Sequence, residues 1–202
     1  MKSIIRKETY EAIYKFLDDV TPIPQDCGLL CGAACCTCSD EADGQDMGIY
    51  LLPGEDKLFS GKEDWLKWSA DQADSYDFPD SWHGKVYFIR CLNAPKCPRE
   101  KRPLQCRFFP LAPHLTENDK LQLILYFNEL PYRCPLIAEK KDLQTNFIRA
   151  VFAAWKKLME DPLIYDLVEL DSSFRSQDSV TVVYTEENFI SLTDSYSSFV
   201  ME

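Results

Sequence analysis

The chain has 202 residues, of which 46% are hydrophobic and 27% are charged, a composition that is typical of globular proteins and excludes a wholly disordered chain. Its net charge of −11 disfavours nucleic acid as a partner, because binding to phosphates requires a basic surface. No apolar stretch approaches the roughly 20 residues of a membrane helix, and the first residues lack an apolar signal segment. We therefore expect a cytoplasmic protein with neither a nucleic-acid nor a membrane partner.

The first quarter of the chain predicts one helix, a cysteine-rich loop and one short strand. Residues 9–20 place apolar side chains at steps of three and four, which predicts an amphipathic helix. The Thr-Pro-Ile-Pro segment at 21–24 ends this helix and leads into the first cysteines. Residues 48–53 are apolar and are closed by a Pro-Gly pair, so they predict a strand or an extended segment.

The next segment contains a helix-start pattern. Ser60 and Glu63 have the spacing of a capping box, in which each side chain binds the other residue's backbone N–H. This pattern predicts a following helix that carries Trp65 and Trp68. Residues 86–89, which are apolar and aromatic, predict a strand that runs into Cys91.

The second half of the chain predicts two strands and a long helix. Residues 121–127 and 180–185 have strand composition, and residues 142–161 repeat apolar side chains at helical spacing up to a proline. The order of elements indicates an α+β fold, a single compact domain with helices around a small sheet and a cysteine-rich metal-binding core of loops. We assign residues 1–162 to the cysteine-rich metal-binding domain and residues 163–202 to a C-terminal extension packed on it.

Cysteine is the most informative residue type. The chain contains nine, namely Cys27, Cys31, Cys35, Cys36, Cys38, Cys91, Cys97, Cys106 and Cys134. An odd number without an export signal argues against a disulfide framework. The adjacent Cys35 and Cys36 cannot easily bond to each other, but two neighbouring thiolates can reach one metal ion. The clustering therefore predicts bound metal rather than cystines.

A basic segment overlaps the second group of cysteines. Residues 96–107 contain five lysine and arginine residues and one acid, Glu100, in an otherwise acidic chain. Because a four-thiolate zinc site keeps a negative charge, nearby cations would stabilise it. We expect Arg102 and Arg107 to act as the cofactor-binding partners that hold sulfur or backbone groups in place. The alternatives are an exposed basic face and a site for an anionic partner.

Several motifs occur in a fixed order. They are the cluster Cys27, Cys31, Cys35 and Cys36; the pair Cys91 and Cys97; the segment Arg102-Pro103-x-x-Cys106-Arg107-x-Phe109-Pro110; and Cys134-Pro135. Over residues 27–135 the chain resembles a family of cysteine-rich zinc- or iron-chelating domains whose first cluster is C-x-x-C-x-x-C-C. The resemblance implies that the metal ligands are Cys27, Cys31, Cys35, Cys36, Cys91, Cys97, Cys106 and Cys134.

One departure from the family pattern affects the first cluster. Three residues separate Cys31 from Cys35, where the family has two, so Cys38 could replace one ligand. The identity of the ion stays open as well, because thiolate ligands suit zinc, mononuclear iron and iron–sulfur clusters.

Function is predicted only as a class. The first hypothesis is a metal-binding protein that holds zinc or iron for folding, storage or recognition of a protein partner. The resemblance also implies an enzyme, since relatives include flagellin lysine N-methylase, which uses S-adenosylmethionine. A redox or electron-transfer protein is the third hypothesis. The chain has seven glycines and no glycine-rich nucleotide loop, which disfavours the Rossmann route to S-adenosylmethionine.

No catalytic residue is predicted. The two histidines, His83 and His114, lie in sequence contexts typical of loops, and we expect them to be surface or partly buried residues rather than general bases. Glu55 follows a Pro-Gly turn and could face the cysteines, although a solvated acid is the default expectation for it.

Overall fold

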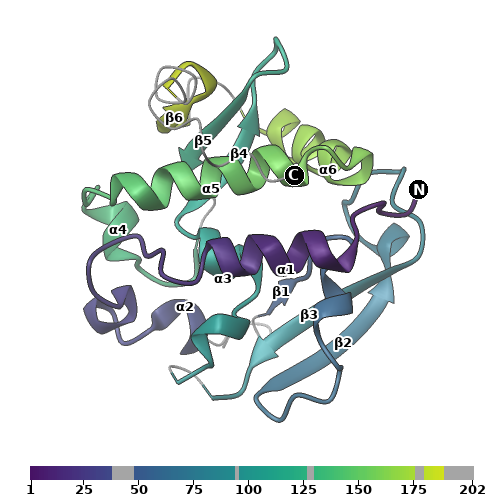
Figure 1. Ribbon diagram of the computed structural model, residues 1–202, viewed down its shortest axis with the longest axis horizontal. Helices are drawn as coiled ribbons and strands as arrows, with labels where there is room; N and C mark the ends of the chain where they lie inside the picture. The colour runs from purple at the N-terminus through teal and green to yellow at the C-terminus, as the bar shows by residue number, and fades with distance from the viewer. Residues whose placement is uncertain (38–47, 94–95, 127–129, 176–179, 189–202) are drawn as a thin grey trace.

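The computed structural model describes residues 1–37, 48–93, 96–126, 130–175 and 180–188. Its α-helices are α1 (Lys7–Phe16), α2 (Ala34–Thr37), α3 (Leu104–Phe108), α4 (Pro135–Ala138), α5 (Thr145–Leu158) and α6 (Pro162–Ser173). Its strands are β1 (Ile49–Tyr50), β2 (Leu66–Gln72), β3 (Lys85–Cys91), β4 (Leu111–Leu115), β5 (Leu121–Leu125) and β6 (Val182–Thr185). The described residues also form four short 3-10 helices, η1 (Cys27–Leu30), η2 (Glu55–Leu58), η3 (Ala73–Ser75) and η4 (Arg99–Lys101). The predicted α+β class is confirmed (Figure 1).

The strands form two antiparallel three-stranded sheets rather than one small sheet. The first has the order β1-β3-β2 and the second the order β4-β5-β6. In the first sheet Leu66 pairs with Cys91, so the end of β3 that carries this cysteine is held by β2. In the second, Leu111 pairs with Leu125. Figure 1 shows the first sheet at the bottom and the second at the top, with α1 and α5 crossing the view between them.

Most of the predicted elements are confirmed. The helix predicted over residues 9–20 is α1, which ends earlier, at Phe16. The strands predicted over residues 86–89, 121–127 and 180–185 correspond to β3, β5 and β6, and the long helix predicted before residue 162 is α5. The segment 48–53 contains a strand of only two residues, β1.

The helix predicted after Ser60 is wrong. The Ser60 N–H and hydroxyl donate to Glu63 Oε1 at 2.6 and 2.9 Å, so one of the two capping-box contacts forms, while Ser60 Oγ accepts from Lys62 N–H at 3.1 Å. The chain then continues as strand β2, which pairs with β3 over its whole length. Aromatic ring contacts of Trp68 with Phe59 and Tyr87 stabilise the extended form, because large rings pack well across a sheet surface. Tertiary pairing therefore overrides the local helix signal.

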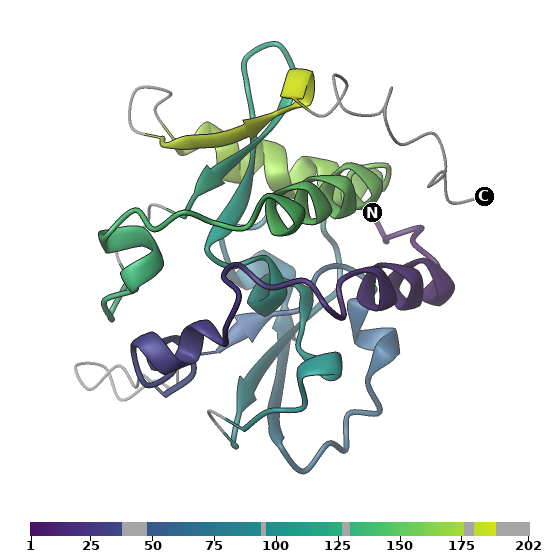
Figure 2. The same cartoon turned by 60° about the vertical axis from the view of Figure 1, so that its left-hand side comes forward.

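One large hydrophobic cluster joins α1, α3, α5 and α6 to both sheets. Its largest fully buried side chains include Tyr10 of α1, Phe108 of α3 and Phe147 of α5. Helix α6 begins after the N-cap Asp161, whose side chain accepts hydrogen bonds from Leu163 N–H and Ile164 N–H. Figure 2 shows α6 beside β4 and α5, and the apolar side chains of α6 enter the same cluster.

In the described part of the chain, no helix combines the length and apolar character needed to cross a membrane.

Candidate metal centre

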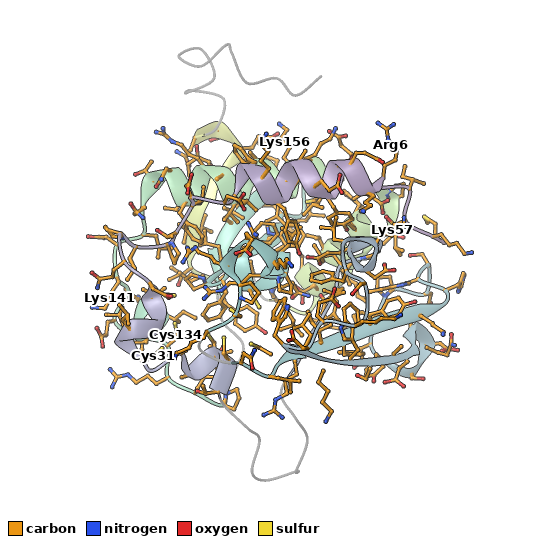
Figure 3. The ribbon with its side chains drawn as sticks, turned by 60° about the horizontal axis from the view of Figure 1, so that its bottom comes forward. Arg6, Cys31, Lys57, Cys134, Lys141 and Lys156 are labelled. Carbon is orange, nitrogen blue, oxygen red and sulfur yellow. The ribbon has the colours of Figure 1, made fainter. Side chains whose placement is uncertain are left out.

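Eight of the nine cysteines lie within the described residues, and all eight are free thiols. They come from separate elements: Cys27 from η1, Cys31 from the segment after it, Cys35 and Cys36 from α2, Cys91 from the end of β3, Cys97 from the segment before η4, Cys106 from α3, and Cys134 from the residue before α4. Short helices and a strand end therefore carry five of these eight cysteines, where loops were expected. Cys38 lies outside the described residues. Figure 3 labels Cys31 and Cys134 on the same side of the molecule.

Four thiols from α2, β3 and α3 face a common space. The Cys35 and Cys36 sulfur atoms are 3.8 Å apart. Together with Cys91 and Cys106 they line one cavity. Burial and the electrostatic field of nearby thiols, including Cys36, raise the pKa of Cys91 and that of Cys106. Cys106 is exposed to solvent and lines this cavity.

A second group lies next to the first. Cys27 packs against Cys134 in a small apolar cluster that also contains Ile23 and Leu136. Burial raises the pKa of Cys27, and the fields of Cys134 and Cys31 add to this effect. Sequence positions more than 100 residues apart are therefore brought together at this point.

Arg102 lies among the thiols. Its Nε–H donates to Cys97 Sγ at 2.9 Å, and its Nη2 is 3.9 Å from Asp26 Oδ2. The hydrogen bond with Cys35 lowers the pKa of the Cys36 thiol to about 7, and the positive charge of Arg102 acts in the same direction. Within this adjacent pair, Cys36 ionises more readily than Cys35, whose pKa the same hydrogen bond raises.

Arg107 donates to several backbone carbonyls and to the Asp18 carboxylate. Its Nε–H donates to the Arg102 carbonyl at 2.8 Å, and its Nη2 donates to the carbonyls of Arg99 and Glu100. On the other side, Nη1 donates to the Tyr14 carbonyl at 3.0 Å and the guanidinium lies 4.5 Å from the Tyr14 ring centroid. Arg107 therefore fixes the segment that carries Arg102 against α1.

Glu55 is fully buried, so the default expectation of a solvated acid is wrong. Its Oε1 accepts from the Tyr14 hydroxyl at 2.6 Å and from Leu104 N–H at 2.8 Å, and its Oε2 accepts from Leu52 N–H at 2.9 Å. Leu104 is the first residue of α3, two residues before Cys106. Glu55 thus anchors the short helix that presents Cys106. A single acid after a Pro-Gly turn did not reveal this role.

The histidines lie in different settings. His83 is exposed, as expected. His114 lies within β4 rather than in a loop and is only 2% exposed, so the loop assignment for it is wrong. Burial, reinforced by the charge of Arg175, lowers the pKa of His114.

The described cysteines lie near one another, but their side chains are not arranged as a complete coordination sphere. Within the described ranges, no group of three or more histidine, cysteine, aspartate or glutamate side chains is arranged to hold one ion. The predicted set of eight ligands therefore stays a prediction.

Comparison with family models, with curated proteins and with solved structures gave no match for this chain, so the family resemblance of the cysteine motifs also stays a prediction.

Proposed function

We propose that this chain is a metal-binding protein that holds zinc or iron through cysteine thiolates where α2, the end of β3 and α3 meet. The observation that carries the proposal is the 3.8 Å separation of the Cys35 and Cys36 sulfur atoms. A tetrahedral zinc site with Zn–S bonds of about 2.3 Å has sulfur atoms about 3.8 Å apart. The adjacent cysteines thus have the spacing of two ligands on one ion.

The chemistry of the remaining donors supports the same proposal. Several thiols that repel one another on ionisation become stable thiolates only when a cation lies between them. Burial, with a smaller contribution from repulsion between thiolates, raises the pKa of Cys91 and that of Cys106, and the charge of a bound metal ion would offset both effects. Soft thiolates suit zinc, mononuclear iron and iron–sulfur clusters, and Arg102 adds one positive charge beside them.

The grouping of thiols favours two neighbouring sets of ligands. Cys35, Cys36, Cys91 and Cys106 line the cavity, and Cys97 is linked to them through Arg102. The second set comprises Cys27, Cys31 and Cys134. Eight ligands would serve two closed four-thiolate sites, or one cluster and one ion.

Elemental analysis of protein purified without oxygen tests the proposal directly. We expect stoichiometric zinc or iron, and absorption near 400 nm with matching sulfide if the group is an iron–sulfur cluster, an order-of-magnitude band position for thiolate-bound clusters. Protein that is folded, fully reduced and free of stoichiometric metal after reconstitution with zinc or iron would refute it.

Single serine replacements test the ligand set. Cys36→Ser and Cys106→Ser should lower the metal content, whereas Cys38→Ser, the matched control in the same segment as α2, should leave it unchanged. A Cys38→Ser protein that loses metal while Cys35→Ser retains it would show that the first cluster is assigned wrongly.

The alternative is an enzyme of the lysine N-methylase type or a redox protein. One observation favours it, namely that four of the thiols line a cavity instead of being sealed in the core. Saturable binding of S-adenosylmethionine would support the methylase, and a reversible change of the visible spectrum on reduction would support the redox protein. A colourless zinc protein that neither binds S-adenosylmethionine nor changes its spectrum on reduction would favour the metal-binding protein over both alternatives.

A further inference from the structure

The cavity beside the thiols has a volume of about 480 Å³, within the range of about 300–1,000 Å³ in which small-molecule sites fall. Its wall is formed from both sheets and from α3, α5 and α6. Aromatic side chains make up much of the lining, among them Phe78, Phe108, Phe109 and Trp155. An apolar wall with a few polar groups is what an organic ligand requires.

Arg175, directly after α6, is the most deeply buried charge on this wall, with its side chain 3% exposed. Its Nη1 donates to the Pro113 carbonyl at 2.7 Å, and its Nη2 contacts Asp171 Oδ2. Asp171 also lines the cavity, and its side chain is 48% exposed. A half-exposed carboxylate thus lies on a buried guanidinium at the edge of the cavity, where another carboxylate could take its place.

Further hydrogen-bond donors lie on the same wall. Tyr50 and Tyr126 line the cavity with Arg175, and both lie near its guanidinium. Trp155 is 5% exposed, and its Nε1–H has no hydrogen-bond partner among the described residues. A buried donor without an acceptor is costly, so this indole N–H would favour any acceptor that comes within its reach.

The other charged residues of the lining are Arg90 and Asp77. Asp77 is exposed at the rim, so the only deeply buried charge in the lining is the positive charge of Arg175. A buried guanidinium pairs best with a planar carboxylate that can accept two hydrogen bonds. This requirement, together with the aromatic wall, defines the class of ligand.

We propose that the cavity binds a small organic acid, with its carboxylate at Arg175 in place of Asp171 and its apolar or aromatic body directed along the cavity toward the thiols. This inference goes beyond the proposed metal site and does not rest on it, because the groups that would bind the carboxylate lie just after α6, on β1 and in the segment after β5. If metal is bound as well, the acid lies next to the metal centre.

The test uses the full-length protein as purified and a panel of aromatic and medium-chain aliphatic acids, including 4-phenylbutyrate and indole-3-acetate, each paired with its neutral amide. Titration is followed by calorimetry and by tryptophan fluorescence. At least one acid should bind saturably and about tenfold or more tightly than its amide, because the amide lacks the charge that pairs with Arg175. Acids that bind no more tightly than their amides would overturn the proposal.

Two variants with opposite expected effects separate recognition from loss of folding. Arg175→Gln should weaken binding of the acid about tenfold or more, whereas Asp171→Asn should strengthen it, because the competing carboxylate is gone. Arg133→Met, at an arginine that is 75% exposed and outside the lining, should leave the affinity unchanged. If Asp171→Asn weakens binding as much as Arg175→Gln does, or if Arg133→Met changes it equally, the site is not the one proposed.

Discussion

Tyr14→Phe isolates the hydrogen bond that ties the buried Glu55 carboxylate to α1. The substitution removes only the hydroxyl, which donates to Glu55 Oε1 at 2.6 Å, and keeps the ring beneath Arg107. A hydrogen bond to a buried charged group contributes about 1.5–3 kcal/mol. At about 2–4 °C per kcal/mol for a chain of this size, the melting temperature should fall by about 3–12 °C at a pH at which Glu55 is ionised.

The effect of Tyr14→Phe should depend on pH. Burial raises the pKa of Glu55, and the Tyr14 hydroxyl opposes this shift, so removing the hydroxyl raises the pKa further. An acid with a raised pKa in the folded state contributes stability below its unfolded pKa and loses it as the pH rises through the folded value. The deficit of the variant should therefore be small below the ordinary glutamate pKa and complete above the raised pKa.

Tyr10→Phe is the matched control, one turn earlier on the same helix. The Tyr10 hydroxyl donates to the neutral Pro53 carbonyl at 2.9 Å, so its loss should cost only about 0.5–1.5 kcal/mol and should not depend on pH. Urea denaturation followed by circular dichroism, at several pH values from about 4 to 8, measures both variants. Equal costs and equal pH profiles for the two would refute the role assigned to an ionisable Glu55.

Three further predictions concern other parts of the molecule. Arg102→Met should reduce metal affinity about 10–100-fold in a competition titration, because it removes the donor to Cys97 Sγ; unchanged affinity would exclude this role. Below about pH 6.5 the unfolded chain binds more protons than the folded chain, because the pKa of His114 is lowered in the fold, so acid destabilises the protein. His114→Gln should therefore lose less stability than the parent protein as the pH falls below this value. Gly48→Ala should destabilise by about 1–3 kcal/mol in urea denaturation, because a Cβ would lie 2.9 Å from the Ile89 carbonyl of β3; a neutral effect would contradict that contact.

The spacing of apolar residues was sufficient to predict the secondary structure of segments in which that spacing repeats regularly. The apolar repeat of α5 predicts a buried helix whichever partner covers it, and Phe147, Val151 and Phe152 are indeed fully buried. The segment after Ser60 shows the opposite case. Its capping-box contact forms, yet pairing with β3 makes the following residues a strand, and no local signal contains that pairing.

Some residues of the candidate site could likewise be predicted from the sequence, and others could not. The count and spacing of cysteines, and the arginines beside them, are visible in the sequence, and the contact of Arg102 with Cys97 spans only five residues. Glu55 gave no such signal, because its partners Tyr14 and Leu104 are 41 and 49 residues away.

The sequence by itself determined the fold class and the presence of a cluster of thiols, from which metal binding is predicted, because composition, periodicity and cysteine spacing are properties of the chain itself. The tertiary structure decided which thiols face one another, that Glu55 is buried beneath the helix of Cys106, and that a cavity joins the thiols to Arg175. The physical reason is that these features depend on contacts between residues far apart in sequence, which form only when the core packs.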